Sequence, residues 1–529
     1  MNEAAAVPIG EDGRATWLGH PRGLFVLFFA EMWERFSYYG MRALLIFYLT
    51  KHWLFSDGEA SLVYGAYTAL VYITPAVGGY LADRYIGQRK AVLYGAVLLT
   101  FGHFLMAFEG DGGQSDPAIS VFWAALAFII VGSGFLKANI STIVGQLYRR
   151  TDPRRDPAYT IFYVGINLGA AMGAIIAGWL GETYGWGYGF GAAGAGMLLG
   201  LLVFVIGKPW LEGRGEARDP AVLQKRVLGL PLEWAIYAGG IVGVAVVWWL
   251  VQNQAIVGTL LGGFGALLVG YVLWTATTKL TREERNRIFA AMILIFGSIL
   301  FWALFEQAGS SLNLFTDRHV DRSFLGTEVP ASVFQSVNAI YIVLLGPLFA
   351  GLWLWLANRG LEPSTPAKFG LALLQLGLSF LVLVWGAAAG GDLVPVLFIF
   401  LLYLFATTGE LCLSPVGLSA MNRLAPTQMA SLIMGVWFFA SAAGNFAAGL
   451  IAQATGSHGA SGEEAGKQTV LDVYSTIGWI GVAVGIGVVL ISPLIKKLMH
   501  LDTLVDDALP GAQEIGEPAA AGVHPGDRV

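Results

Sequence analysis

The sequence predicts an all-α membrane protein of about fourteen transmembrane helices, arranged as two six-helix bundles with an inserted two-helix hairpin. Of the 529 residues, 56% are hydrophobic and only 13% are charged, and the mean hydropathy is +0.64. That composition excludes a soluble globular protein. Long charge-free stretches recur along the chain, and most are near the ~20 apolar residues that a helix needs to cross ~30 Å of hydrocarbon.

The charge-free stretches give the candidate helices in chain order. They are residues 60–82, 91–108, 117–136, 157–181, 183–207, 234–278, 329–358, 369–391, 424–462 and 473–495. Residues 234–278 are long enough for two helices, with a turn at Gln252-Asn253-Gln254. Weaker spans, interrupted by charged residues, cover residues 22–50, 287–315 and 393–422.

The pattern of charges divides the chain into five segments. They are an N-terminal segment (1–21), a first six-helix bundle (22–207), a basic linker with the inserted hairpin (208–285), a second six-helix bundle (286–500) and a disordered tail (501–529). Lys and Arg gather in alternating loops, and cytoplasmic loops are the basic ones. We therefore expect an inner (cytoplasmic) membrane protein with both termini in the cytoplasm.

Seven ionisable residues interrupt the apolar spans. They are Glu31, Glu34, Arg35, Arg42, Lys137, Glu306 and Glu410. Each costs roughly 2.5–3.5 kcal/mol at a helix centre, so an ionisable residue in a membrane span is a functional-site hypothesis by default. Four anions against three cations leave one carboxylate without a partner, which predicts a proton site.

Five of the polar residues in the first span share one helix face. At 100° per residue, Glu31, Glu34, Arg35, Tyr38 and Arg42 fall within an arc of about 100°. Such a stripe cannot face lipid, so it must line a water-filled cavity or a protein interface. The alternative is a ladder of ion pairs that only orients this helix.

At this point the sequence resembles the proton-coupled oligopeptide transporters (the POT or PTR family), a branch of the major facilitator superfamily. The similar segments are Glu31-x-x-Glu34-Arg35-Phe36-x-Tyr38-Tyr39-Gly40, Gly78 to Lys90, Gly134-Phe-Leu-Lys137-Ala-Asn139, Phe162-Tyr163-Val-Gly-Ile166-Asn167-Leu-Gly169 and Gly409-Glu410-Leu-Cys-Leu-Ser414-Pro415. They stand in the family's order, and the resemblance covers residues 20–500, including the hairpin seen in bacterial members. Ala138 departs from the pattern, where proline is common.

The resemblance implies a proton symporter that imports di- and tripeptides by alternating access on the major facilitator fold. A peptide is a zwitterion, so its site needs a negative group, a positive group and roomy apolar pockets. Glu410 is the candidate partner for the amine, and Arg42 and Lys137 are the candidates for the carboxylate. Asn167 and Asn338 are candidate hydrogen-bond groups, although Asn338 could be a packing amide. The expected cavity walls are Tyr38, Tyr39, Tyr72, Trp302, Trp437 and Ser414.

Proton coupling is expected at Glu31, Glu34, Arg35 and Glu306, through ion pairs that exchange partners. In this scheme Glu31 and Glu34 compete for Arg35 and Lys137, Glu306 competes for Arg42, and bound peptide breaks a pair between Glu410 and Lys137. Asp83, Arg84 and Arg89 are expected to form ion pairs at a cytoplasmic gate that open in the inward-facing state. A static loop anchor is the alternative for these three residues.

Other classes of function are less well supported. The sequence contains no cluster of metal ligands and no serine nucleophile motif, so we expect neither an enzyme nor a metal site, and no cofactor besides protons. We expect peptides, protons and the lipid bilayer as partners, no nucleic acid, and a functional monomer. The closest alternative is transport of nitrate or another small organic anion on the same fold, although Glu410 would repel an anion.

Overall fold

The computed structural model describes residues 16–501 apart from residues 150, 151, 153, 228, 325 and 457–465. Fourteen helices of 19 residues or more lie in this part of the chain. Twelve spans, one of them α9 together with α10, are long and apolar enough to cross a membrane. The two long helices outside those spans are α1 and α3. Residues 1–15 and 502–529, which hold most of the predicted N-terminal segment and all but one residue of the predicted tail, lie outside the described residues.

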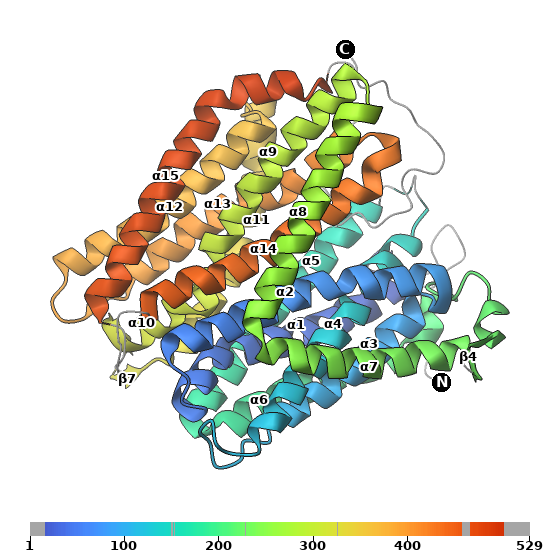
Figure 1. Ribbon diagram of the computed structural model, residues 1–529. Helices are drawn as coiled ribbons and strands as arrows, with labels where there is room; N and C mark the ends of the chain where they lie inside the picture. The colour runs from blue at the N-terminus through green and yellow to red at the C-terminus, as the bar shows by residue number, and fades with distance from the viewer. Residues whose placement is uncertain are drawn as a thin grey trace, which may run out of the picture.

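The first half of the molecule is a bundle of six helices, shown in blue to teal in Figure 1. They are α1 (Arg22–Phe47, extended by a wider turn at Tyr48–His52), α2 (Asp57–Leu81, extended at Ala82–Ile86), α3 (Gln88–Met106), α4 (Ile119–Gln146), α5 (Arg155–Tyr184) and α6 (Trp186–Ile206). Ser56 and Glu59 cap α2 reciprocally, which satisfies two of the amides that a helix start leaves open. Gly87, at φ +78°, makes the sharp turn into α3 that a side chain would resist.

The second half is a bundle of the same size, shown in yellow-green to red in Figure 1. Its helices are α9 (Arg282–Phe305), η5 (Glu306–Gly309), α10 (Ser311–His319), η6 (Ala331–Gln335), α11 (Ser336–Ala357), α12 (Thr365–Ala389), α13 (Leu397–Leu424), η7 (Thr427–Met429), α14 (Ala430–Gly456) and α15 (Lys467–Leu498). A capping box formed by Thr281 and Glu284 begins α9. We refer to the two bundles as the N-half and the C-half.

A linker and a hairpin connect the halves. The linker holds η3 (Lys208–Leu211) and η4 (Val222–Gln224), and the hairpin helices are α7 (Leu232–Gln252) and α8 (Gln254–Lys279). Asn253 alone separates them, at the predicted turn. Figure 1 shows α7 running along the N-half and α8 along the C-half.

The strands are all two residues long and only tie loops together. β1 (Thr16–Trp17) pairs with β2 (His20–Pro21), β3 (Arg226–Val227) with β4 (Leu230–Pro231), and β6 (Ser323–Phe324) with β7 (Thr327–Glu328), each pair being antiparallel. β5 (Val320–Asp321) pairs in parallel with β8 (Val394–Pro395). The fold is therefore helical in substance, as predicted.

The halves join through α2 against α14 and through α5 against α11, which lie side by side in Figure 1. Gly65 and Gly449 let α2 and α14 touch, because a Cβ on Gly65 would come within 2.8 Å of the Gly449 Cα. Polar bridges between the halves gather at one end of the bundle, which we call the sealed end. They are Arg318 with Asp57, Lys51 with Asp317, and the Ser332 amide with Glu182.

The seventh span departs from the single helix expected at residues 287–315. The α-helix ends at Phe305, a tighter turn follows at Glu306–Gly309, and Ser310 breaks the path before α10 begins. Broken helices are tolerated inside a membrane where they are buried in protein or line a cavity. The break places Glu306 where the backbone leaves the helix.

Candidate functional site

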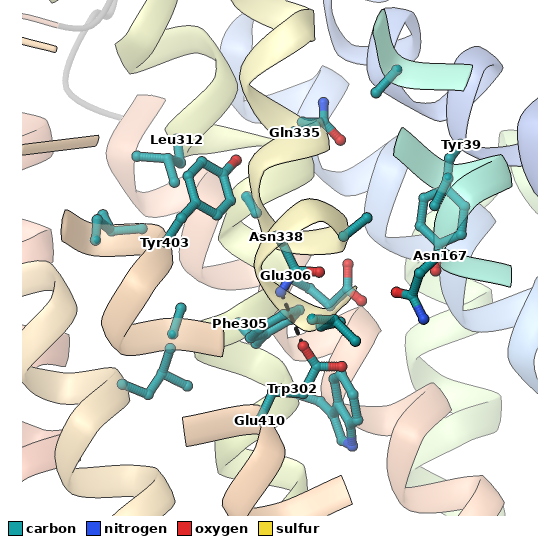
Figure 2. Close-up of a pocket in the computed structure, with 18 of the residues that line it drawn as sticks. Tyr39, Asn167, Trp302, Phe305, Glu306, Leu312, Gln335, Asn338, Tyr403 and Glu410 are labelled. Atoms are coloured by element: carbon teal, nitrogen blue, oxygen red, sulfur yellow. Dashed lines mark hydrogen bonds between the residues drawn. The ribbon is translucent and has the colours of Figure 1, made fainter. Parts of the chain in front are cut away.

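A cavity of about 150 Å³ lies between the halves, lined by residues of α1, α2 and α5 on one side and of the C-half on the other. Eight of the residues expected to bind substrate or protons line it. They are Tyr39, Arg42, Tyr72, Asn167, Trp302, Glu306, Asn338 and Glu410. Figure 2 shows Tyr39 and Asn167 on one side of this cavity, and Trp302, Glu306, Asn338 and Glu410 at its centre.

An ion pair crosses the cavity between the halves. The Arg42 guanidinium on α1 donates to the Glu306 carboxylate at the break after α9, and its Nε donates to the Tyr64 hydroxyl on α2. Arg42 is 6% exposed and Glu306 is 3% exposed. Removing one partner from a buried pair leaves the other charge uncompensated, at a cost of roughly 3–5 kcal/mol. A proton on Glu306 would release Arg42 for another anion, so this pair can couple protonation to ligand binding.

Glu410 on α13 has a different environment. Its Oε2 accepts a hydrogen bond of 3.0 Å from the Asn338 amide on α11, and the same amide donates to Thr407 at 3.0 Å. In the part of the chain that the structure describes, no cation lies within ion-pair distance of Glu410. A buried carboxylate held by one neutral amide is a ready acceptor for an ammonium group.

The expected pair between Glu410 and Lys137 is therefore absent from this conformation. The Lys137 ammonium on α4 lies 3.6 Å from the centroid of the Tyr38 ring and 5.6 Å from that of Tyr72. Cation–π contact with tyrosine compensates part of the loss of water around a buried ammonium. The sequence put both residues in membrane spans, but it could not give the distance between helices of opposite halves.

The acids of the first span form their own cluster on α1. Arg35 bonds to Glu31 at 2.6 Å through Nη2 and at 2.7 Å through Nε, and its Nε lies 3.3 Å from Glu34. Glu31 and Glu34 are each 1% exposed. Neither oxygen of Glu34 has a hydrogen-bond partner among the described residues, nor does Oε2 of Glu31. These three side chains do not line the cavity.

Four residues expected to contact substrate do not line the cavity in this conformation. Tyr38 is fully buried in the core of the N-half, and Lys137 lies on its ring. Trp437 on α14 packs at 6.3 Å against the Phe369 ring and also closes over Gly417. Ser414 lies one turn beyond Glu410 on α13, away from the lining.

In the part of the chain that the structure describes, Asp83 forms no ion pair with Arg84 or Arg89, as expected of the inward-facing state. Arg89 pairs with Glu216 of the linker, and Asp83 accepts a hydrogen bond of 2.7 Å from Gln88. Arg84 lies against the rings of Tyr80 and Tyr85, at 5.9 and 5.7 Å. Residues of the linker contact the loop between α2 and α3. No motif in the sequence indicated that contact.

Several cavity residues were missed from the sequence. Tyr163, Gln335 and Tyr403 line the cavity, and Tyr64 binds Arg42 from just behind it. Tyr163 lies one turn before Asn167 and accepts the Asn167 amide on its carbonyl at 3.0 Å, so its place inside the α5 motif was an available signal. Tyr403 lies two turns before Glu410 on α13, and that spacing could have identified it.

The profile described as the POT family matches residues 89–470. The chain belongs to the POT family. It is 36% identical to "Peptide transporter YePEPT" of Yersinia enterocolitica over 83% of this chain and 89% of that protein. It is 37% identical to "Uncharacterized transporter YclF" of Bacillus subtilis, over 94% and 98%, and 32% identical to "Dipeptide and tripeptide permease B" of Edwardsiella piscicida, over 92% and 96%.

Solved structures of the POT family share this fold. The "peptide transporter POT in complex with sulfate" matches with a TM-score of 0.80 at 34% identity, covering 93% of this chain and 98% of that one. A Glu-to-Gln mutant of a POT peptide transporter, bound to alafosfalin, matches with a TM-score of 0.79 at 36% identity, over 92% and 97%. The two-bundle fold and membership of a transporter family are thus established for this chain.

Proposed function

We propose that this POT family protein imports di- and tripeptides together with protons across the cytoplasmic membrane. The observation that carries the proposal is the pairing of charges in the cavity. Among the described residues, no cation lies within ion-pair distance of Glu410, while Arg42 is a cation whose anion, Glu306, can be neutralised by a proton. The amine of a zwitterion can pair with Glu410 directly, and its carboxylate can pair with Arg42 once a proton has neutralised Glu306.

The sealed end gives the orientation of this state. Ion pairs between the halves close that end, so substrate reaches the cavity from the opposite end. In a protein with cytoplasmic termini, the sealed end faces outward and this conformation faces inward. Alternating access then requires these bridges to break and contacts at the opposite end to form.

A proton on Glu306 frees Arg42 to bind the peptide carboxylate, while Glu410 holds the amine. Asn338 can keep its bond to Thr407 when the amine takes Glu410. Loss of the proton to the cytoplasm restores the pair between Arg42 and Glu306 and expels the carboxylate. Lys137 and the Glu31–Arg35–Glu34 cluster do not line the cavity. A change of charge on the cluster changes the electrostatic potential at Lys137.

The energy available is sufficient for accumulation. One proton that moves down 100 mV gains about 2.3 kcal/mol, and a pH difference of one unit adds about 1.4 kcal/mol. Together these support roughly 500-fold accumulation of a neutral peptide at one proton per cycle.

Uptake of labelled Ala-Ala into proteoliposomes tests the function. We expect an inwardly directed proton gradient to drive accumulation, and unlabelled Ala-Ala, but neither nitrate nor a sugar, to compete. Glu306→Gln should lose gradient-driven accumulation and keep exchange of labelled for unlabelled peptide. If uptake does not depend on the proton gradient, proton coupling is rejected. If nitrate competes and unlabelled Ala-Ala does not, the alternative of anion transport is favoured.

A further inference from the structure

Two short β-hairpins repeat one sequence pattern. The N-terminal β-hairpin (residues 16–21, β1 and β2) leads into α1, and the linker β-hairpin (residues 226–231, β3 and β4) leads into α7. Both contain Leu-Gly-x-Pro, at residues 18–21 and 228–231. The prolines that precede the helices have nearly equal angles, φ −53° and ψ 139° at Pro21 and φ −53° and ψ 141° at Pro231. The same entry into a helix thus occurs twice, and the function proposed above uses neither copy.

Both β-hairpins lie at the end of the bundle opposite the sealed end. From the N-terminal β-hairpin, α1 and its extension run to Lys51, which belongs to the sealed end. From Asp57 at the sealed end, α2 runs back to the loop before α3. Lys90 at the start of α3 pairs with Glu233 at the start of α7 at 2.6 Å. This end also carries the basic loops that the sequence assigns to the cytoplasmic side.

Leu18 of the N-terminal β-hairpin has an unusual backbone conformation. Its φ is +50°, in the left-handed region where leucine is strained and Gly, Asn or Asp is favoured. Its side chain is 77% exposed, and that of the neighbouring Trp17 is 51% exposed. A residue held in a sparsely populated conformation points to a functional contact. Because the exposed side chain is apolar, we expect that contact to be apolar as well.

The N-terminal β-hairpin lies against a face of α1 that is turned toward the bilayer. The centroid of the Trp17 ring lies 4.4 Å from that of Phe25, one turn into α1. Phe29 follows after a further turn on the same face and is 38% exposed. Trp is enriched where membrane segments meet the interface with water. Trp17 and Leu18 therefore lie at the level of the lipid headgroups.

Both β-hairpins are flanked by cations that have no acidic partner among the described residues. Arg22 follows the N-terminal β-hairpin and lies 6.0 Å from the centroid of the Trp210 ring, near Lys208 at the end of α6. A cation in the first turn opposes the helix dipole, so stabilisation of α1 does not explain Arg22. Lys225 and Arg226 at the linker β-hairpin are exposed. Clusters of basic residues at the cytoplasmic surface attract anionic lipids.

From this arrangement we propose that the two β-hairpins are membrane anchors that bind anionic phospholipids of the cytoplasmic leaflet. The turn at Trp17 and Leu18 enters the headgroup region, while Arg22 and Lys208 bind the phosphate groups. The linker β-hairpin is the second anchor, with its exposed Val227 beside the two cations. Zwitterionic lipids carry no net charge to compensate these cations, whereas anionic lipids do. The inference does not depend on which substrate is transported.

A fluorescent label on the turn measures its insertion. Leu18→Cys in a Cys412→Ala background carries a nitrobenzoxadiazole label in nanodiscs, whose two faces are both open to water. With an equimolar mixture of phosphatidylcholine and phosphatidylglycerol, iodide should quench this label at least about fivefold less than in phosphatidylcholine alone, because each cation near an anionic surface contributes about fivefold in binding. Val227→Cys tests the second anchor. The label on Ala221→Cys, an exposed residue of the linker, is the matched control and should be quenched equally in both lipids.

Two further variants separate the charge from the apolar turn. Arg22→Gln combined with Lys208→Gln should abolish the effect of phosphatidylglycerol on the label at residue 18. Leu18→Asn keeps the turn, because Asn adopts a positive φ readily, and removes the apolar tip. A lipid that binds the folded protein raises its unfolding temperature. In detergent, added phosphatidylglycerol should therefore stabilise the wild type more than phosphatidylcholine does, and Leu18→Asn should lose most of that difference.

Three results would overturn the proposal. The first is equal quenching by iodide of the labels at residues 18 and 221. The second is protection of residue 18 that is the same in phosphatidylcholine alone, which would exclude binding of anionic headgroups. The third is an equal gain in unfolding temperature from phosphatidylglycerol in the wild type and in Leu18→Asn.

Discussion

Glu31 and Glu34 are one turn apart and equally buried, yet their partners differ. Glu31 accepts charge-assisted bonds of 2.6 and 2.7 Å from Arg35, whereas Glu34 lies 3.3 Å from Arg35 with both oxygens lacking a hydrogen bond among the described residues. A hydrogen bond to a charged group contributes about 1.5–3 kcal/mol, while a buried group without a partner costs about 1–3 kcal/mol. Glu31 is thus held by hydrogen bonds and an ion pair, whereas Glu34 has only the longer ion pair with Arg35.

The first prediction follows from this difference. Glu31→Gln should lower the thermal unfolding temperature of the purified protein, because a neutral amide interacts less strongly with Arg35. Glu34→Gln should change that temperature less, since it weakens only the 3.3 Å ion pair with Arg35 and breaks no hydrogen bond among the described residues. Thermal unfolding in one detergent, with both variants side by side, measures the contrast. An equal fall in both would show that Glu34 is bonded in solution.

Individual residues were predicted from the sequence to different degrees. The buried charges and the signature on α1 identified Arg42, Glu306 and Glu410, because ionisable groups in membrane spans are costly and stand out. Tyr403 is uncharged and one of many aromatic residues, which make up 13% of the chain, so only its spacing of two turns from Glu410 could have identified it. The expected pair of Lys137 with Glu410 is absent from this conformation, and the distance between helices of different halves depends on the conformational state.

At the scale of elements, the linker holds the loop between α2 and α3. Arg89 donates its main-chain amide to the Gly215 carbonyl at 2.8 Å and its side chain pairs with Glu216. Gln146 on α4 accepts the Gly215 amide at 2.8 Å. In this conformation Arg89 therefore pairs with Glu216 and not with Asp83, the partner expected from the sequence.

Glu216→Gln should free Arg89 to approach Asp83 and favour the outward-facing state. The Glu216 side chain is 43% exposed, and exposed ion pairs contribute only about 0–1 kcal/mol, so the shift should stay below about fivefold. Labelling of Leu312→Cys at the cavity by an external maleimide, in a Cys412→Ala background, reports the outward-facing population. Adding Asp83→Asn should cancel the increase. If Glu216→Gln does not change the labelling of Leu312→Cys, Arg89 is a static anchor of the loop and not part of a gate.

The inserted hairpin bridges both halves. Lys90 on α3 pairs with Glu233 on α7 at 2.6 Å, and the Tyr94 hydroxyl bonds the Tyr237 carbonyl at 2.7 Å. On the other side, the rings of Phe446 and Phe439 of α14 cover Gly258 and Gly265 of α8. With only Asn253 between α7 and α8, rocking of the halves must change the angle between these two helices. No hairpin residue lines the cavity among the described residues.

The prediction for the hairpin uses two glycines on one helix. A Cβ on Gly258 would meet the Phe446 ring at 2.7 Å, whereas Gly262 has open space around it. Overpacking costs about 1–3 kcal/mol, so Gly258→Leu should displace α8 from α14 and slow Ala-Ala uptake with little change in KM. Gly262→Leu, with the same added side chain, should transport like the wild type. If both variants take up Ala-Ala at the same rate, the packing of α8 against α14 does not affect transport.

Most elements could be predicted from the sequence, and the exceptions have physical causes. Apolar length and the turn at Asn253 sufficed for fourteen helices and the hairpin, because the bilayer fixes the length of a span. The break at Glu306–Gly309 was missed. Glu306 there contacts Arg42 of the N-half, and the Gln307 amide donates to the Ala448 carbonyl on α14 at 3.0 Å. Both are tertiary contacts, which the sequence does not reveal.

For the whole molecule, the sealed end sets the energy difference between states. Arg318 on α10 forms a two-pronged pair with Asp57 at the start of α2, at 2.6 and 2.9 Å, and both side chains are largely buried. Such fork-shaped pairs are stronger and more directional than single contacts. The outward-facing state must break this pair together with that between Lys51 and Asp317.

Exchanging the two charges separates a gate from a simple anchor. Asp57→Arg alone places two cations together and should open the sealed end, so that external labelling of Leu312→Cys rises roughly tenfold for each 1.4 kcal/mol lost. The double variant Asp57→Arg with Arg318→Asp restores opposite charges and should return labelling toward the wild-type level. Both variants carry Asp57→Arg and therefore share any disturbance of the start of α2. A return of labelling in the double variant thus cannot be explained by misfolding. If labelling stays high in the double variant, while Ala-Ala uptake shows the protein to be folded, then attraction between these two side chains is not what keeps the halves together at this end.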